Sequence, residues 1–319
     1  MVYDMILFVL VYLYSFYLVI GGNDWFMIWL GLEINMMMFI MIMFSRYSVF
    51  NIESCLSYFF IQSLGSAIFM GLFYIGKEYM DFVLCLTLGY KMGAGPFFFW
   101  FPSVCSGISW MSCFVLMSFQ KIIPLMLISM FISWVFFFVV VVSLLMGVFG
   151  SFNQRDLKRL MAYSSIYHLG WILLCILIDS ESWFNYLLIY MLMVFPVIFF
   201  MKVEDISDLM DMVKVSSSLW MTVIMLSMAG MPPFLGFFLK WFAFSMIMGY
   251  SIFYMVVLVV CSIVMFYVYF RVIYDVLVGY FCYSSWVNYF MDSSSSVWLE
   301  FLCVLGMLFG VGVGIVFIM

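Results

Sequence analysis

The chain has 319 residues, of which 69% are hydrophobic and only 8% are charged, and its formal net charge is −5. A soluble domain carries about 25% charged residues, so this chain lacks the polar surface that a soluble fold requires. Its mean hydropathy of +1.26 predicts an all-α membrane protein, and the scattered charges offer no basic surface for nucleic acid.

The N-terminus has neither a basic, cleavable signal sequence nor an Arg-rich transit peptide, so the first apolar run is expected to be a retained span. The composition includes 33 Met, 40 Phe and 21 Tyr but only 11 Lys and Arg. This bias is typical of a T-rich genome with a reassigned Met codon, and it indicates a chain encoded and synthesised inside a mitochondrion.

Cutting the chain at charges, glycines and prolines gives about eleven transmembrane helices, because a span needs about 20 apolar residues. The expected spans cover about 2–20, 25–44, 54–76, 82–101, 105–123, 125–149, 157–178, 183–201, 217–242, 251–274 and 297–318. With eleven spans, most loop Lys and Arg residues fall on the N-terminal side of the membrane. The positive-inside rule then predicts an N-terminus in the matrix and a C-terminus in the intermembrane space.

Two of these spans contain glycines and prolines beside a lysine. The fourth has Pro96 a few residues after Lys91, and the ninth has Pro232 and Pro233 before Lys240. Proline removes a helix donor, so each span is predicted to be a discontinuous helix. Interrupted helices at corresponding positions indicate inverted repeats. We therefore expect one polytopic membrane domain over 1–319, with repeats at about 1–123 and 125–275 and a C-terminal helix at about 297–318.

Five ionisable residues lie deep in these spans, namely Glu33, Lys91, Lys121, His168 and Lys240. Each costs roughly 2.5–3.5 kcal/mol at the centre of a membrane helix, so function is the default hypothesis. Glu33 is the expected charge partner of a buried lysine, and His168 suits a proton relay. The alternatives are a structural ion pair, a neutral hydrogen-bonded carboxyl and a satisfied core histidine.

The eight cysteines contain no Cys-x-x-Cys pair and lie mostly in apolar runs. Zinc and iron–sulfur sites need clustered thiolates, so no metal site is predicted. Nucleotide-binding glycine motifs and paired histidines for haem are also missing from the sequence. The chemistry expected of this chain is therefore proton movement without a bound cofactor.

Several blocks together resemble the chain 2 family, the antiporter-like membrane subunits of mitochondrial NADH:ubiquinone oxidoreductase (respiratory complex I). The blocks are Trp29-Leu-Gly-Leu-Glu-Ile-Asn35, Lys91-Met-Gly-Ala-Gly-Pro-Phe-Phe-Phe-Trp100, Gln120-Lys-Ile-Ile-Pro124, Asn153 to Trp171 and Ala229 to Trp241. Beyond Trp241 the match is only one of hydropathy. Animal members of that family have eleven helices, which agrees with the count made here.

The resemblance implies a core membrane-arm subunit that translocates protons across the inner mitochondrial membrane. Electron transfer from NADH to ubiquinone, with FMN and iron–sulfur clusters, would occur in other subunits. By matching motifs, Glu33 and Lys91 would be an acid–lysine pair, Lys121 a central relay lysine and Lys240 the lysine leading to the exit side. His168 matches a histidine of its block. The implied partners are neighbouring antiporter-like and small membrane-arm subunits, together with membrane lipids.

The sequence departs from the family pattern beside Lys91. The family usually has His where Phe97 or Phe98 stands, and Glu where Ser103 follows Pro102. Any role of those polar groups is therefore not carried over to this chain. One functional alternative is a free-standing cation/proton antiporter, which would exchange ions without other subunits. Another is a structural subunit whose buried charges only orient its helices.

Overall fold

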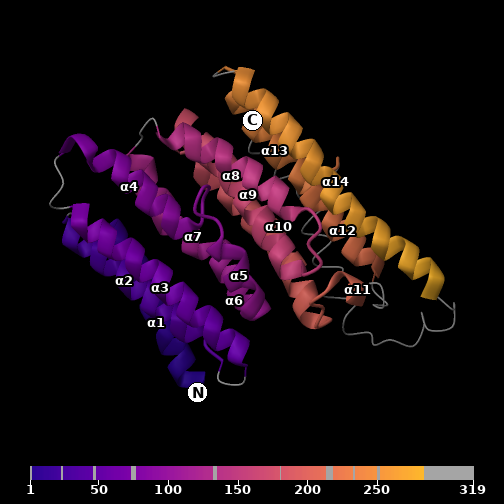
Figure 1. Ribbon diagram of the computed structural model, residues 1–319, viewed down its shortest axis with the longest axis horizontal. Coiled ribbons are helices and arrows are strands. Elements are labelled where there is room, and N and C mark those ends of the chain that lie inside the picture. Colours follow the sequence, from indigo (N-terminus) through magenta and orange to yellow (C-terminus); the bar gives the residue numbers. More distant parts are fainter. Residues whose placement is uncertain are drawn as a thin grey trace. The chain divides into compact units, whose positions relative to one another are not determined.

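The computed structural model describes residues 2–22, 24–45, 48–72, 77–131, 135–179, 181–212, 218–232, 234–249 and 252–283. Helices account for almost all of this part of the chain, and its only β pairing is an isolated bridge between Asp156 and Asp208 (Figure 1). The expected C-terminal helix at 297–318 lies outside the described residues. The all-helical prediction is confirmed for the part that the structure describes.

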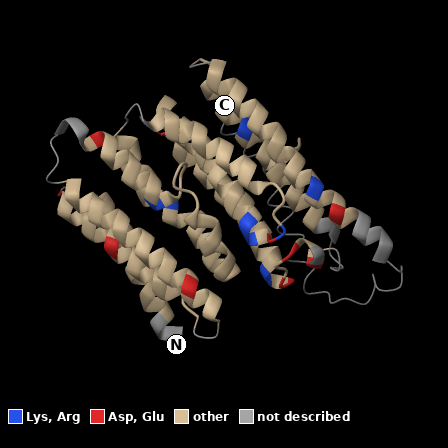
Figure 2. Ribbon diagram, viewed as in Figure 1, with Lys and Arg blue, Asp and Glu red and all other residues tan. Residues whose placement is uncertain are grey.

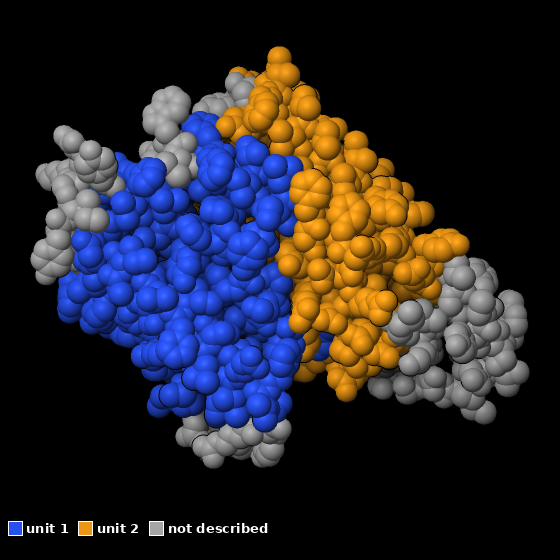
Figure 3. All heavy atoms as spheres, in the orientation of Figure 1, with its two compact units in different colours: residues 1–146 blue, residues 147–319 orange. Residues whose placement is uncertain are grey.

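The chain divides into two compact units, Met1–Met146 and Gly147–Met319 (Figure 3). The first unit contains α1 (Val2–Ile20), α2 (Trp25–Met43), α3 (Val49–Gly71), α4 (Lys77–Met92), α5 (Trp100–Gly107), α6 (Trp110–Met117), α7 (Phe119–Met130) and the start of α8 (Val135–Ser151). Within it α1 packs on α2, α3 packs on α2, α4 and α5, and α4 also packs on α7. Helices α3, α4 and α7 therefore enclose the interior of this unit.

The second unit contains the end of α8, α9 (Leu157–Ile178), α10 (Ser182–Val203), α11 (Leu209–Met212), α12 (Ser218–Ala229), α13 (Leu235–Ile247) and α14 (Ile252–Tyr283). Helix α9 is buried on nearly all sides and packs on α10 and α13. Polar side chains of membrane helices are expected to face the bundle interior, and Ser164, Ser165 and His168 of α9 are all buried. Helix α9 is therefore the core helix of this unit.

Six of the described helical segments are long and apolar enough to cross a membrane, namely Trp25–Met43, Val49–Gly71, Trp110–Met130 (α6 with α7), Leu157–Ile178, Ser182–Val203 and Ile252–Leu277. Shorter apolar helices cover Met5–Ile20, Phe136–Ser151 and Leu235–Ile247. Charged residues are sparse along these helices (Figure 2). The structure thus has the helix lengths and apolar surfaces of a multi-pass membrane protein.

The expected boundary between the fifth and sixth spans, at 123–125, is wrong. That boundary falls inside α7, and Trp110–Met130 forms one spanning segment that is followed by α8. The helix is interrupted at Ser118, whose φ of −115° and ψ of −80° are not helical. Proline acts on the turn that precedes it, so Pro124 is tolerated within α7 while the interruption lies upstream.

Helices α4 and α12 end in the same backbone motif. Gly93 has φ of +70° and Gly230 has φ of +84°, a region that glycine enters without steric cost. The Ala94 N–H donates to the Gly89 carbonyl at 2.9 Å, and the Met231 N–H donates to the Leu226 carbonyl at 3.3 Å. These bonds satisfy carbonyls that the end of a helix leaves open. Each helix therefore ends cleanly just before a proline-containing segment.

Candidate functional site

Lys91 lies in the last turn of α4 and is only 7% exposed. Helix α3 holds it in two ways. The Gln62 side-chain amide donates to the Lys91 carbonyl at 2.9 Å. Gly65 leaves room for the lysine stem, since a Cβ at that position would lie 2.9 Å from Lys91 Cγ. The backbone and the side chain of Lys91 are thus both fixed by one face of α3.

Lys121 lies near the start of α7 and is 2% exposed. Its Nζ atom is 5.1 Å from the centroid of the Phe101 ring on α5. A cation over an aromatic face at this distance gains electrostatic stabilisation. Pro124, one turn later, lacks the N–H that an α-helix would direct to the Gln120 carbonyl. The Lys121 ammonium group therefore lies over an aromatic ring, beside a turn of α7 that lacks one backbone hydrogen bond.

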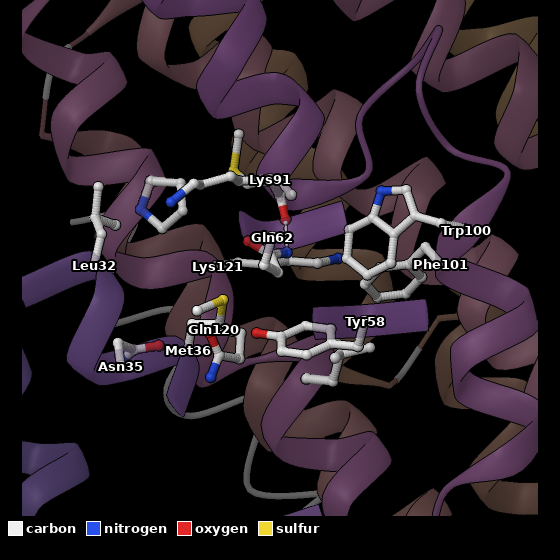
Figure 4. A pocket seen from close by; sticks show the side chains of 13 residues that line it. Leu32, Asn35, Met36, Tyr58, Gln62, Lys91, Trp100, Phe101, Gln120 and Lys121 are labelled. Carbon is white, nitrogen blue, oxygen red and sulfur yellow. Dashed lines mark hydrogen bonds between the residues drawn. The ribbon is translucent and has the colours of Figure 1, made fainter. Parts of the chain in front are cut away.

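One cavity in the first unit has both lysines in its wall (Figure 4). It is lined by Leu32, Asn35, Met36, Tyr58, Gln62, Lys91, Met92, Trp100, Phe101, Leu116, Gln120, Lys121 and Pro124. It leaves about 20 Å³ for the centres of water molecules. A single water needs on the order of 10–15 Å³ by this measure, so the cavity can hold one.

Glu33 lies on α2, one residue from the cavity-lining Leu32, and is half-buried. Its carboxylate acts electrostatically on the Lys91 ammonium group. The two described side chains form no ion pair within 4.0 Å. The structure therefore places Glu33 beside a residue of the cavity wall, without a direct ion pair to Lys91.

Lys240 lies on α13 in the second unit and is 8% exposed. Its Nζ atom donates to the Ala229 carbonyl, the last residue of α12, at 2.7 Å. A cation at a helix C-terminus meets the negative end of the helix dipole. A Cβ on Gly230 would lie 2.7 Å from this Nζ atom, so the absence of a side chain there leaves space for the ammonium group.

His168 is fully buried in α9 of the second unit. Its Nδ1 atom lies 3.0 Å from the Tyr186 hydroxyl of α10, and its ring lies 4.9 Å from that of Tyr190. Trp171, three residues later, packs edge-on against Phe244 of α13 with ring centroids 5.1 Å apart. His168 thus belongs to a buried aromatic layer on the helix that packs against α13.

The positions that depart from the family pattern lie near the cavity rather than in its wall. The Phe97 ring packs against Tyr90 at 5.5 Å, and Phe98 is buried. Ser103 is exposed, and its hydroxyl donates to the Trp100 carbonyl at 2.7 Å. Of these three side chains only the serine hydroxyl can hydrogen-bond, and it is turned back onto its own helix.

The polar face of α3 was not predicted from the sequence. Buried polar residues recur there at three- and four-residue steps, at Asn51, Ser54, Tyr58, Gln62 and Ser66. This is the spacing of one helix face, and buried polar groups on such a face are expected to have partners. The pattern could have identified Tyr58 and Gln62 as residues that line a polar site.

The described residues contain no group of three His, Cys, Asp or Glu side chains placed to hold a metal ion. The ionisable residues instead fall into two sets. Glu33, Lys91 and Lys121 gather in the first unit, whereas His168 and Lys240 lie on adjoining helices of the second. Buried lysines that face a small polar cavity can exchange protons through it.

Comparison with known proteins identifies the family. The NADH:quinone oxidoreductase/Mrp antiporter transmembrane family matches residues 71–265. NADH-ubiquinone oxidoreductase chain 2 of Anopheles gambiae is 33% identical over 320 residues, covering 92% of this chain and 93% of the relative. The chain belongs to the NADH-ubiquinone oxidoreductase chain 2 family. The corresponding chain of Locusta migratoria, which is 32% identical over 85% of both chains, supports the same placement.

Solved structures share the fold of this chain 2 family member. A chain of respiratory complex I from Thermus thermophilus aligns with a TM-score of 0.80 and 23% identity, covering 98% of this chain and 79% of its own. A chain of an archaeal membrane-bound sulfane sulfur reductase aligns with a TM-score of 0.75 and 16% identity, covering 95% and 72%. At these identities the likeness concerns the fold alone.

Proposed function

We propose that the chain translocates protons through a buried relay in which Glu33, Lys91 and Lys121 act in the first unit and His168 and Lys240 in the second. The observation that carries this proposal is the cavity with both Lys91 and Lys121 in its wall. Buried ionisable groups inside a membrane protein mark ion paths when they face a common polar space. The proton leaves the ammonium group of one lysine and is taken up by the neutral amine of the next.

The chain is a membrane-arm, antiporter-like subunit of a proton-translocating NADH:ubiquinone oxidoreductase. It is a multi-pass membrane protein, and other subunits of that complex are its partners. We propose that electron transfer from NADH to ubiquinone takes place entirely in those subunits and that this chain binds no redox cofactor. Neighbouring antiporter-like and small membrane-arm subunits are the proposed direct contacts.

The charge on Glu33 supplies a means of control. Two unit charges 4 Å apart interact by roughly 4 kcal/mol at an effective dielectric constant of 20. Since Glu33 acts on Lys91 without a close ion pair, a small change in their separation alters how strongly the ammonium form is favoured. We propose that approach of Glu33 retains the proton on Lys91 and that separation releases it toward Lys121.

The proposed architecture is eleven spans with two inverted repeats. It is supported by the matching ends of α4 and α12, each with a glycine at positive φ followed by a proline segment and a second short helix. In this proposal α4 with α5 and α12 with α13 are the two discontinuous helices. Because α7 extends to Met130, the division between the repeats moves from 123–125 to the segment between α7 and α8.

We further propose that the chain lies in the inner mitochondrial membrane with its N-terminus in the matrix and its C-terminus in the intermembrane space. Support comes from the basic residues Arg155, Lys158 and Arg159, which fall together between α8 and the first turn of α9. Basic loops remain on the side from which a membrane protein is inserted. Protease accessibility of this loop in intact mitoplasts tests the orientation.

Glu33→Gln tests the control step. Removing the carboxylate charge while keeping its shape is expected to lower the rate of NADH-driven proton uptake into proteoliposomes at least about tenfold, because the charge that controls the proton affinity of Lys91 is lost and about 1.36 kcal/mol corresponds to a tenfold change in rate. The matched control is Glu53→Gln, on the exposed face of α3. If both variants assemble and pump equally, Glu33 has no part in the relay.

Gly65→Ala tests the position of Lys91. The added Cβ would press on the lysine stem, with Lys91 Cγ only 2.9 Å away. We expect normal assembly with proton pumping reduced about tenfold, since a displacement of 1 Å at a reacting group can cost about 10²-fold. Gly71→Ala is the control, because no atom lies within 4 Å of a Cβ at that position. Equal pumping by the two variants would show that the stem tolerates displacement.

One assay distinguishes the hypothesis of a free-standing antiporter from that of a subunit of the complex. The isolated chain in liposomes is expected to exchange no cations against a pH gradient, whereas pumping is expected only in the assembled complex. Cation exchange by the isolated chain at a rate matching NADH-driven pumping would favour the antiporter instead.

A further inference from the structure

Gln120 is a buried polar group of the cavity that the relay does not use. Its Nε2 atom is shielded from the surface and has no hydrogen-bond partner, and the residue lines the same cavity as Lys91 and Lys121. An amide nitrogen left unpaired inside a protein is destabilising. A native protein that keeps such a group usually gives it a partner, and an ordered water is a common one.

The surroundings of Gln120 suit a water molecule. The cavity has about 20 Å³ for water centres, compared with the 10–15 Å³ or so that one water needs. A buried water also needs two to four polar partners. Polar side chains in the wall include the two lysines, Asn35 and the Tyr58 hydroxyl. Space and hydrogen-bonding groups therefore coincide in the cavity that Gln120 lines.

Gln62, the other glutamine that lines the cavity, already has a hydrogen-bond partner. Its Nε2 atom donates to the Lys91 carbonyl at 2.9 Å. The two glutamine amides therefore have different roles at this site. Gln62 fixes the end of α4, whereas Gln120 lines the same cavity with a buried amide nitrogen that has no hydrogen-bond partner.

We propose that the Gln120 carboxamide binds a water molecule in this cavity and holds it for proton transfer between Lys91 and Lys121. The water oxygen accepts a proton from the Lys91 ammonium while one of its own protons passes to the neutral Lys121 amine, so the water is regenerated. Gln120 donates a hydrogen bond to the water and takes no proton, which makes it a positioning residue. This inference rests on the proposed relay and adds to it a bound water molecule and the residue that binds that water.

The direct test is the density of ordered water in the intact complex. A structure at a resolution that shows waters is expected to have one about 2.7–3.2 Å from Gln120 Nε2, inside the cavity. A Gln120 amide that instead bonds a protein group, with no water beside it, would overturn the proposal.

The functional test is Gln120→Met, which keeps the length of the side chain and removes its amide. Proton pumping by the assembled complex is expected to fall between about tenfold and 100-fold, and the solvent deuterium isotope effect on turnover is expected to rise because proton transfer becomes limiting. Gln154→Met, in the segment that follows α8, is the matched control, since the Gln154 amide donates to the Gly150 carbonyl of α8 at 2.9 Å.

The Lys91→Met variant distinguishes a failure of this inference from a failure of the proposed relay. If Lys91→Met stops pumping while Gln120→Met leaves its rate and isotope effect unchanged, the relay stands and the water-holding role of Gln120 is overturned. If neither variant changes pumping, the relay itself fails. If the Gln120→Met complex does not assemble, the density of ordered water beside Gln120 in the unchanged complex tests the proposal.

Discussion

Lys91→Met is expected to abolish proton translocation by the assembled complex, with a loss of at least about 10²-fold, the lower range for a positioned acid–base group. Methionine keeps the unbranched stem that packs on Gly65 but cannot carry a proton. Apolar substitution of a buried cation removes a desolvation cost, so assembly is expected to be preserved. Proton uptake by proteoliposomes, normalised to complex quantified on a native gel, measures the effect.

The control for Lys91→Met is Lys202→Met in the last turn of α10. This lysine is exposed, and its removal is expected to leave pumping within twofold or so of the unchanged protein, since surface substitutions are usually near neutral. Full pumping by an assembled Lys91→Met complex would contradict the relay and favour a structural role for the buried charges.

Gly236→Ala is expected to destabilise the junction of α12 and α13. A Cβ at this position would overlap the backbone carbonyl oxygen of Ser227, which cannot move without displacing α12. Overpacking a core in this way costs about 1–3 kcal/mol or more. We expect a lower midpoint of thermal unfolding and reduced yield of assembled complex, because Lys240 also loses its bond to Ala229 when the helices separate.

Gly249→Ala is the matched control for the junction. No atom lies within 4 Å of a Cβ at Gly249, so the same chemical change meets open space there. The yield and the unfolding midpoint of this variant are expected to equal those of the unchanged protein. If Gly236→Ala behaves in the same way, the close approach of α12 and α13 does not limit their assembly.

Composition and the position of charges within apolar runs were enough to predict a membrane protein and to single out its unusual residues. With 8% charged residues the chain cannot cover a soluble surface, so membrane helices follow from composition. The ends of α1 coincide with the predicted span 2–20, because a polar segment bounds that apolar run. Lys91, Lys121 and Lys240 stood out since each is a charge in an apolar run, and all three are buried.

Which residues share a site depends on how the helices pack. Gln62 is 29 positions from Lys91 in sequence, and the hydrogen bond between them depends on how α3 packs against α4. Likewise, the interruption at Ser118 and the continuity through Pro124 depend on packing around α6 and α7, which hydropathy does not describe. The face that a nearly all-apolar helix presents to its neighbours is set by side-chain packing, because its hydrophobic pattern has no polar side to orient it.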